Sequence, residues 1–205
     1  MKLGELFNKY KADKTIKHKY DTVYEKYFEP IKDDQLNILE IGVYKGLSTL
    51  ALHEYFPHAT LYGLDLFKRV PMEQIEPYGL ERCNFVKGDS TFAFDSNLTN
   101  LKFDIIIDDG MHTPIANTKT FRNFKPLLAD DGQYFIEDVW PIELMSEEEM
   151  QHQWIKNHPF DYNVHMNKIF LQTINDSNMN IERFDLRKIT GQPDSYIIRL
   201  TNEKN

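Results

Sequence analysis

Leu39-Glu-Ile-Gly-Val-Tyr-Lys-Gly46 decides the expected fold, because an apolar run passes directly into a glycine-containing turn. Residues 37–41 are expected to form a buried strand, and residues 47–55 a helix that ends before Pro57. In an open α/β sheet, ligands bind at the carboxyl ends of the strands, where such turns lie. The stretch therefore predicts one strand–turn–helix unit of an open α/β sheet with a ligand-binding turn.

Short apolar runs alternate with helix-length segments further along the chain. The expected strands are residues 60–64, 84–88, 103–107 and 133–136, with a helix over residues 115–128. Strands that alternate with helices pair in parallel through right-handed crossovers. Residues 181–186 and 196–201 flank Gly191-Gln-Pro-Asp194, which predicts a hairpin after the parallel strands.

Composition and charge exclude several classes of function. Lys and Arg number 24 against 32 Asp and Glu, a net charge of −8, so the surface should repel a phosphate backbone and nucleic acid is not an expected partner. No apolar run approaches the roughly 20 residues of a membrane span, and the N-terminus lacks the apolar core of a signal peptide. The single cysteine, Cys83, excludes an internal disulfide and a cysteine-rich zinc site. We expect a cytoplasmic protein that does not contact a membrane.

Acidic residues at three successive strand ends indicate a nucleoside cofactor. Glu40 lies just before the first turn, Asp65 ends the second strand and Asp89 follows the third. An acid at the end of the second strand is suited to accept both ribose hydroxyls. Gly42 would permit a tight turn, and Gly46 a close approach of helix to strand.

Two cofactors compete for this description. A dinucleotide site would carry G-x-G-x-x-G, but the matching positions hold Tyr44 and Leu47, whose bulk would obstruct a pyrophosphate. S-adenosylmethionine has no phosphate, and the ammonium group of its methionine part suits an acid at Glu40. The sequence favours S-adenosylmethionine, with Tyr44 and Asp108 as further cofactor-binding candidates.

A second acidic group follows the fourth and fifth strands. Asp109 comes after the fourth strand, and Glu137 and Asp138 come after the fifth. The ends of neighbouring strands lie about 5 Å apart, so these carboxylates should converge, and hard oxygen ligands suit Mg²⁺, Mn²⁺ or Ca²⁺. Mg²⁺ or Mn²⁺ is the expected ion. His112, three residues after Asp109, would then act as the base that takes a proton from a hydroxyl. The alternative is that these acids are a helix cap and a solvated turn.

These motifs resemble those of the macrocin/mycinamicin-type sugar O-methyltransferases, which are metal-dependent S-adenosylmethionine enzymes. The resemblance lies in residues 39–46, in Ile107-Asp-Asp-Gly-Met-His112 and in Ile136-Glu-Asp-Val139. Ala12-Asp-Lys14 and His18-Lys-Tyr20 are similar to a segment that precedes the core in that family.

The resemblance implies a class I methyltransferase fold, which is a Rossmann-like α/β fold. Its seven-stranded sheet is mostly parallel with an antiparallel last strand, and helices cover both faces. The resemblance also implies cofactor contacts and Mg²⁺ ligands, with His112 as the general base. The cofactor contacts would be Glu40, Gly42, Asp65 and Asp89, and the metal ligands Asp109, Glu137 and Asp138.

On this interpretation residues 1–205 are one methyltransferase domain. A helical prelude covers residues 1–34, the cofactor and metal core residues 35–140, and a lid with the terminal hairpin residues 141–205. The expected partner is a small-molecule acceptor, a sugar or a sugar-containing metabolite, and a homo-oligomer is compatible with the sequence. Met111 departs from the small polar residue usual in the family.

Three other interpretations stay open: a non-sugar acceptor, an NAD(P)-dependent oxidoreductase, and a methyltransferase-like binding module without catalysis. Trp140 would stack on a sugar ring or anchor a connecting helix to the core. Lys14 and Lys45 are candidates for contact with the cofactor carboxylate. The remaining histidines have no metal-ligand spacing and are expected mostly at the surface: His18, His53, His58, His152, His158 and His165.

Overall fold

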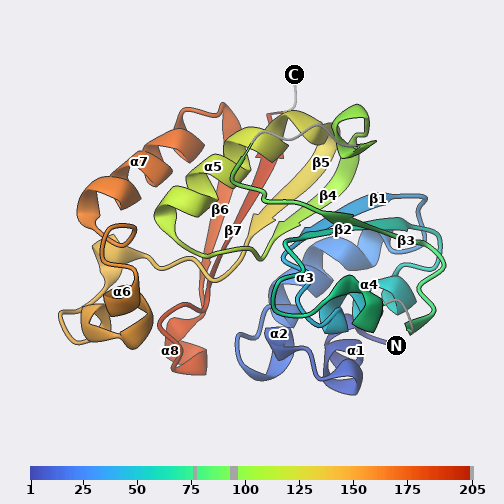
Figure 1. The fold of residues 1–205 in the computed structure, drawn as a ribbon, viewed down its shortest axis with the longest axis horizontal. Coiled ribbons are helices and arrows are strands. Elements are labelled where there is room, and N and C mark those ends of the chain that lie inside the picture. Colours follow the sequence, from blue (N-terminus) through green and yellow to red (C-terminus); the bar gives the residue numbers. More distant parts are fainter. Residues whose placement is uncertain (76–77, 93–96, 204–205) are drawn as a thin grey trace.

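A seven-stranded sheet runs through the centre of the molecule in the computed structural model, which describes residues 1–75, 78–92 and 97–203 (Figure 1). The strand order is β3-β2-β1-β4-β5-β7-β6. The strands from β3 to β5 are parallel, and β7 is antiparallel to both of its neighbours. This is the expected class I methyltransferase fold. Its strands are β1 (Asn37–Ile41), β2 (Thr60–Asp65), β3 (Cys83–Lys87), β4 (Phe103–Asp108), β5 (Leu128–Ile136), β6 (Met179–Asp185) and β7 (Tyr196–Asn202).

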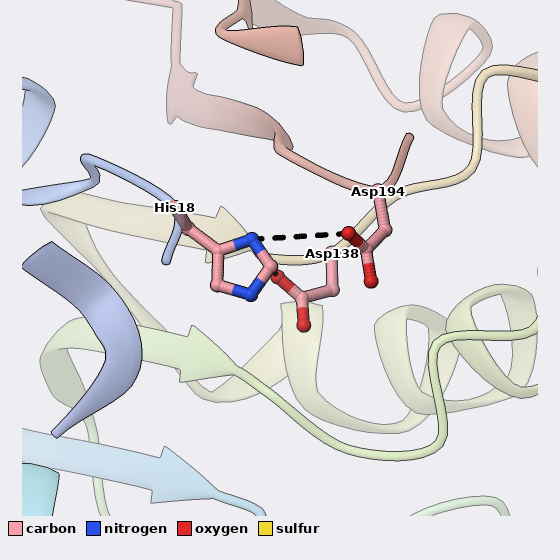
Figure 2. Close-up of side chains that lie close together, drawn as sticks. All are labelled: His18, Asp138 and Asp194. Carbon is pink, nitrogen blue, oxygen red and sulfur yellow. Dashed lines mark ion pairs between the residues drawn. The ribbon is translucent and has the colours of Figure 1, made fainter. Parts of the chain in front are cut away.

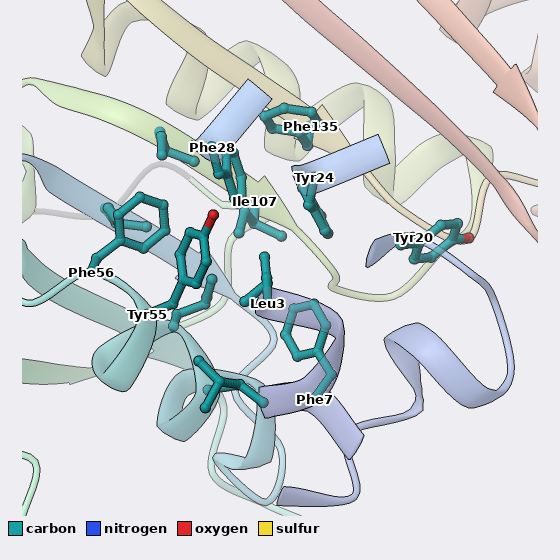
Figure 3. Packing of buried hydrophobic residues seen from close by; sticks show 14 of the residues in the cluster. Leu3, Phe7, Tyr20, Tyr24, Phe28, Tyr55, Phe56, Ile107 and Phe135 are labelled. Atoms are coloured by element: carbon teal, nitrogen blue, oxygen red, sulfur yellow. The ribbon is translucent and has the colours of Figure 1, made fainter. Parts of the chain in front are cut away.

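Helices cover both faces of the sheet, as expected. On one face, α1 (Leu3–Tyr10), α3 (Asp21–Phe28) and α4 (Leu47–Tyr55) pack around an aromatic cluster (Figure 3). On the other, α5 (Pro114–Phe124) and α7 (Val164–Asn175) cover a second cluster. Successive strand residues alternate between the two clusters, because side chains along a strand point to opposite faces. The shorter helices are α2 (Asp13–Ile16), α6 (Gln153–Asn157) and α8 (Arg187–Thr190).

The register of the central strands brings three turns to one level. Ile41 at the end of β1 lies opposite Asp108 of β4, and Asp108 lies opposite Ile136 of β5. The next residue after each strand continues the ladder: the Asp109 N–H donates to the Ile41 carbonyl and the Glu137 N–H to the Asp108 carbonyl, each at 2.9 Å. The switch in strand order lies between β1 and β4, where open α/β sheets bind ligands.

Several boundaries differ from the expectation. The helix expected to reach residue 128 ends at Phe124, because Pro126 follows within a 3₁₀ turn over Lys125–Leu127. Strand β5 starts at Leu128 rather than residue 133, and its pairing with β4 shifts register between Phe103 and Ile105. The polar Asp130-Asp131 stretch hid this extension in the sequence. Strand β3 begins one residue earlier than expected.

The segment after β5 is more irregular than the sequence suggested. The spacing of Ser146 and Glu149 predicts a capping box and a polar helix after it. The two residues form these reciprocal bonds, but only a 3₁₀ turn over Glu149–Gln151 follows. Further 3₁₀ turns are Glu29–Ile31, Met72–Gln74, Asn97–Asn100 and Ile142–Leu144. Within the described residues, no helix combines the length and the apolar composition needed to cross a bilayer.

Candidate active site

The turn between β1 and α4 needs both of its glycines. Gly42 has a φ of +91°, and a Cβ there would lie 1.9 Å from the carbonyl oxygen of Asp109. Gly46 has a φ of +71°, and a Cβ there would lie 2.9 Å from Cγ2 of Ile75. Only glycine fits the first position without moving backbone, so the turn rests directly against the loop that follows β4.

Asp65 fastens this turn from the end of β2. Its Oδ2 accepts a hydrogen bond from the Tyr44 N–H at 2.9 Å, and its Oδ1 accepts one from the Phe67 N–H at 2.7 Å. Tyr44 and Phe67 both have left-handed backbone, with φ of 49° and 50°, which these bonds help to hold. Each carboxylate oxygen has a second lone pair, so Asp65 can still accept from ribose hydroxyls.

Glu40 and Asp89 occupy different environments. Glu40 is buried; its Oε2 accepts from the Thr49 hydroxyl, while Oε1 has no hydrogen-bond partner among the described residues. Burial raises the pKa of the Glu40 carboxyl, although Lys14 acts in the opposite direction. Asp89 accepts from the N–H and hydroxyl of Thr91, at 2.9 Å and 2.7 Å, and so also serves as a turn residue. The unpaired oxygen of Glu40 suits a cationic ligand group.

Asp108 ends β4 beneath the joined turns. Its Oδ1 accepts weakly from the Gly110 N–H at 3.3 Å, and its Oδ2 is buried with no hydrogen-bond partner in the described part of the chain. Burial raises the pKa of the Asp108 carboxyl to about 7. The group is therefore a buried acid with one oxygen left for a ligand.

Asp109, His112 and Asp138 converge as the sequence predicted. Nε2 of His112 lies 3.6 Å from Asp109 Oδ1 and 4.0 Å from Asp138 Oδ2, and one ligand atom of each residue falls within 4.8 Å of the others. His112 and Asp138 have left-handed backbone, with φ of 59° and 50°. Such strain at non-glycine residues is typical of functional sites.

Glu137 lies deeper than these three residues. Its side chain is 2% exposed, Lys14 Nζ is 2.6 Å from its Oε2, and the Tyr24 hydroxyl donates to its Oε1. Both oxygens already have partners within the chain, so Glu137 does not belong to the group formed by Asp109, His112 and Asp138. The predicted role of Glu137 as a metal ligand stays a prediction.

Side chains of the prelude hold the catalytic acids, which the sequence did not foresee. Lys14 of α2 bridges Asp109 Oδ2 at 2.9 Å and Glu137. The Tyr20 hydroxyl donates to Asp138 Oδ1 at 2.7 Å. The only sequence signal was the similarity of residues 12–14 and 18–20 to the segment that precedes the core in the family. The Lys14 ammonium is buried between two acids, and a contact of Lys14 with the cofactor carboxylate stays a prediction.

His18 corrects the expectation for that histidine (Figure 2). It is 1% exposed, and its Nδ1 lies 2.9 Å from Ser195 Oγ, 3.5 Å from Asp138 Oδ1 and 3.9 Å from Asp194 Oδ1. Burial lowers the pKa of His18 to about 4, so the ring is neutral near pH 7. The His18 ring stacks on the Tyr20 ring and packs beside Asp138.

Carboxylates outnumber cations at this end of the sheet. Among the described residues, five acids lie at this end of the sheet: Glu40, Asp108, Asp109, Glu137 and Asp138. Asp109, Glu137 and Glu40 act on the Lys14 ammonium, while Lys17 acts on Asp138. Burial, with Asp109 and Asp194 adding to it, raises the pKa of Asp138 well above its ordinary value. Burial likewise raises the pKa of Glu137, which Lys14 opposes. A divalent cation would relieve this excess of negative charge, so the oxygen-rich donor set fits one.

The segment after β5 supports the His112 loop. The Tyr162 hydroxyl donates to the His112 carbonyl at 2.6 Å, and it accepts from Trp154 Nε1 at 2.6 Å. Trp140 is 3% exposed and packs edge-on against the Tyr162 ring, with centroids 5.8 Å apart. A buried Trp140 cannot stack on a sugar, so the anchoring alternative is correct. Met111 is 44% exposed beside the site.

Comparison with known proteins agrees with this geometry. Residues 39–139 match a family model described as a methyltransferase domain. These residues are a methyltransferase domain of this family. The matched region runs from the strand before the cofactor turn to the residue after Asp138, so it contains every catalytic and metal candidate.

Two curated relatives of this methyltransferase domain are named as sugar O-methyltransferases. Mycinamicin VI 2''-O-methyltransferase of Micromonospora griseorubida is 30% identical over 149 residues, covering 67% of this chain and 36% of that protein. A tetracenomycin-C 3'-O-methyltransferase of Streptomyces olivaceus, whose substrate carries a 2-methoxyrhamnosyl group, is 28% identical over 146 residues, covering 67% of this chain and 37% of that protein. The chain thus spans little more than a third of these relatives' length.

Solved structures confirm the fold. MycE methyltransferase of the mycinamycin pathway, in a complex with Mg, S-adenosylhomocysteine and mycinamycin VI, superposes with a TM-score of 0.70 at 22% identity. The match covers 100% of this chain and 55% of MycE. The Podospora anserina methyltransferase PaMTH1 matches with a TM-score of 0.61 at 16% identity, covering 88% of this chain and 77% of that one.

Proposed function

We propose that the chain is an S-adenosylmethionine-dependent, metal-assisted O-methyltransferase that acts on a hydroxyl of a sugar or sugar-containing small molecule. The contact between Gly42 and Asp109 carries this proposal, because it joins the cofactor turn to the catalytic loop. Methyl transfer requires the donor carbon and the attacking oxygen to lie in line at close range. A cofactor bound at the turn would present its methyl group beside Asp109 and His112.

The cofactor would be held by residues of β1, β2, β3 and β4. Asp65 would accept the ribose hydroxyls, and the unpaired oxygen of Glu40 suits the ammonium end of the methionine part. Asp89 would lie on the adenine side. The remaining members of the proposed cofactor-binding set are Gly42, Tyr44, Gly46 and Asp108.

The acceptor hydroxyl would be deprotonated at His112. Its Nε2 faces Asp109 and Asp138, and Tyr162 holds the loop through the backbone carbonyl. The proton would pass to Nε2 as the oxygen–carbon bond forms and the carbon–sulfur bond breaks. Asp109 and Asp138, with Glu137 as the predicted third ligand, would hold Mg²⁺ or Mn²⁺, an ion that lowers the pKa of a bound hydroxyl.

The names of the relatives support a sugar hydroxyl as the acceptor, because two of them name O-methyltransferases whose substrates carry a rhamnosyl or an olivosyl group. The proposal includes a biosynthetic role in glycan, capsule or natural-product tailoring, a cytoplasmic location and one methyltransferase domain over residues 1–205. A homo-oligomer remains a prediction from the sequence.

A binding experiment tests the cofactor. S-adenosylhomocysteine at about 100 times its Kd adds roughly 2.7 kcal/mol of stability, which is several degrees of Tm for a chain of this size. We expect this shift with S-adenosylhomocysteine and none with NAD or NADP. A shift with a dinucleotide alone would overturn the assignment of the turn. No shift from either ligand would favour a binding module that has lost catalysis.

A transfer experiment tests the reaction. The full chain, Mg²⁺ and S-adenosylmethionine labelled in the methyl group are incubated with a panel of glycosides that carry vicinal hydroxyls, with catechols as the non-sugar comparison. We expect label in a glycoside, loss of transfer with a chelator and recovery with added Mg²⁺. Transfer to catechols alone would overturn the sugar as the proposed acceptor. Transfer that a chelator leaves unchanged would overturn the metal-assisted mechanism.

A further inference from the structure

Lys14 lies at the centre of the acidic cluster rather than at its edge. The side chain is 2% exposed, and its Nζ is 2.6 Å from Glu137 Oε2 and 2.9 Å from Asp109 Oδ2. These two acids follow neighbouring strands, so one ammonium bonds to the ends of both β4 and β5. A Lys ammonium has three donors and no acceptor, which suits a place between carboxylates.

The surroundings of Lys14 compensate its charge. Asp109 and Glu137 each place a carboxylate oxygen within 2.9 Å of the ammonium, whose side chain is buried. Without this cation, Asp109 and Glu137 would face each other at the same level of the sheet with no charge between them. The ammonium therefore takes the position that a cation shared by these two carboxylates would occupy.

The prelude fixes Lys14 firmly. The Tyr20 N–H donates to the Lys14 carbonyl at 2.7 Å, and the same Tyr20 bonds to Asp138 through its hydroxyl. Tyr24 of α3 bonds to the other oxygen of Glu137. The lysine and both tyrosines thus form one hydrogen-bonded network with Asp109, Glu137 and Asp138.

We propose that Lys14 is a positioning residue, a cation supplied by the chain itself that fixes Asp109 and Glu137 and leaves room for one divalent ion rather than two. The inference rests on the proposed metal-assisted function. It assigns to α2 a part in the catalytic centre, because the ammonium sets both the geometry of the acids and the number of ions they bind.

Counting bound ions tests the inference without relying on activity. Mn²⁺ binding to the full chain, without acceptor, is measured by electron paramagnetic resonance for wild type, Lys14→Met and Lys14→Arg. Lys168→Met on the exposed face of α7 is the matched control. We expect one Mn²⁺ per chain for wild type, Lys14→Arg and the control, and one more for Lys14→Met, whose side chain has a similar length but no charge.

Turnover and cofactor affinity give a second measurement. Lys14→Met should lower kcat by about 100-fold, because misplaced reacting groups are costly, while the Kd for S-adenosylhomocysteine stays within about threefold. Lys14→Arg should restore most of kcat, because the charge returns. A defect confined to Kd would instead assign Lys14 to the cofactor site and overturn the proposal.

The outcomes separate the two proposals. One Mn²⁺ in both wild type and Lys14→Met, with equal affinity, overturns the role of Lys14 and leaves the metal-assisted function standing. No Mn²⁺ in wild type but one in Lys14→Met overturns the metal-assisted function and, with it, the inference that Lys14 leaves room for one divalent ion. No Mn²⁺ in either chain overturns both.

A double variant keeps the inference testable if Lys14→Met does not fold. Lys14→Met with Glu137→Gln removes both members of the ion pair, so no buried carboxylate is left without its cation. The double variant should give a folded circular dichroism spectrum and a cooperative thermal transition in the presence of chelator, above any transition that Lys14→Met alone shows. An equal or lower Tm would show that the ammonium does not support Glu137.

Discussion

The two halves of the candidate site, the proposed cofactor half and the proposed catalytic half, are held in different ways. In the cofactor half, Asp65 bonds to backbone N–H groups 21 and 2 residues away in the chain. In the catalytic half, Asp109, Glu137 and Asp138 are held by side chains of the prelude that lie 95, 123 and 118 residues away. The cofactor turn is therefore a local structure, whereas the catalytic acids are ordered only when the prelude packs against the sheet.

The halves also differ in charge. The acids of the catalytic half are crowded, and burial raises the pKa of both Glu137 and Asp138. Asp65 stands alone among backbone donors. The difference teaches that the cofactor half needs a particular backbone, while the catalytic half needs compensating cations. Variants that affect one half and spare the other test this division.

Asp109→Asn should separate the halves most strongly. Loss of one carboxylate charge at the cation site removes several kcal/mol of transition-state stabilisation, so kcat should fall by about 10³-fold. The Kd for S-adenosylhomocysteine, measured by calorimetry, should stay within about threefold. Asp131→Asn on the exposed part of β5 is the matched control. An equal loss of cofactor affinity in Asp109→Asn would mean that the two halves act as one unit.

Asp108 lies where the halves meet, and its burial predicts a pH-dependent stability. The folded pKa of about 7 lies above the ordinary value of 3.8, so the folded chain binds more protons than the unfolded chain between these values. Stability is therefore lost as the pH rises from about 4 to 7, and stays low above 7.

In Asp108→Asn this loss should disappear. With chelator present, the variant should gain about 3 kcal/mol of unfolding free energy over wild type between pH 5 and pH 8. This corresponds to a Tm difference that is larger at pH 8 by roughly 6–12 °C. Thermal unfolding across this range is the measurement, with Asp131→Asn again as control. A Tm difference between variant and wild type that does not change with pH would show that ionisation of Asp108 does not destabilise the folded chain.

Asp65→Asn should produce the smallest effect and act on the cofactor half alone. An amide oxygen is a weaker acceptor than a carboxylate, and hydrogen bonds to charged groups contribute about 1.5–3 kcal/mol. The Kd for S-adenosylhomocysteine should rise by about tenfold, while kcat at saturating cofactor changes by less than about threefold. A large fall in kcat with an unchanged Kd would contradict the division into halves.

Much of the fold was predictable, because strand and helix periodicity do not depend on distant contacts. The strand at residues 37–41 and the helix at residues 47–55 agree with the structure residue for residue. The start of β5 was not predictable, since Asp130 and Asp131 lack an apolar pattern. They lie in the register irregularity between Leu128, which pairs with Phe103, and Gln133, which pairs with Ile105. Trp140 was ambiguous and the surface expectation for His18 was wrong for a similar reason, because the burial of a side chain is set by what packs on it.

The sequence by itself determined the order of strands and helices along the chain, the glycine turn and the placement of acids at or just after the carboxyl ends of β1 to β5. These features follow from local periodicity and from the rule that ligands bind at the carboxyl ends of parallel strands. The tertiary structure alone decided which acids meet which cations. Lys14, His18, Tyr20 and Tyr24 reach the catalytic acids only because α2 and α3 fold back under the sheet, and a buried charge is stable only where a partner from elsewhere in the chain compensates it.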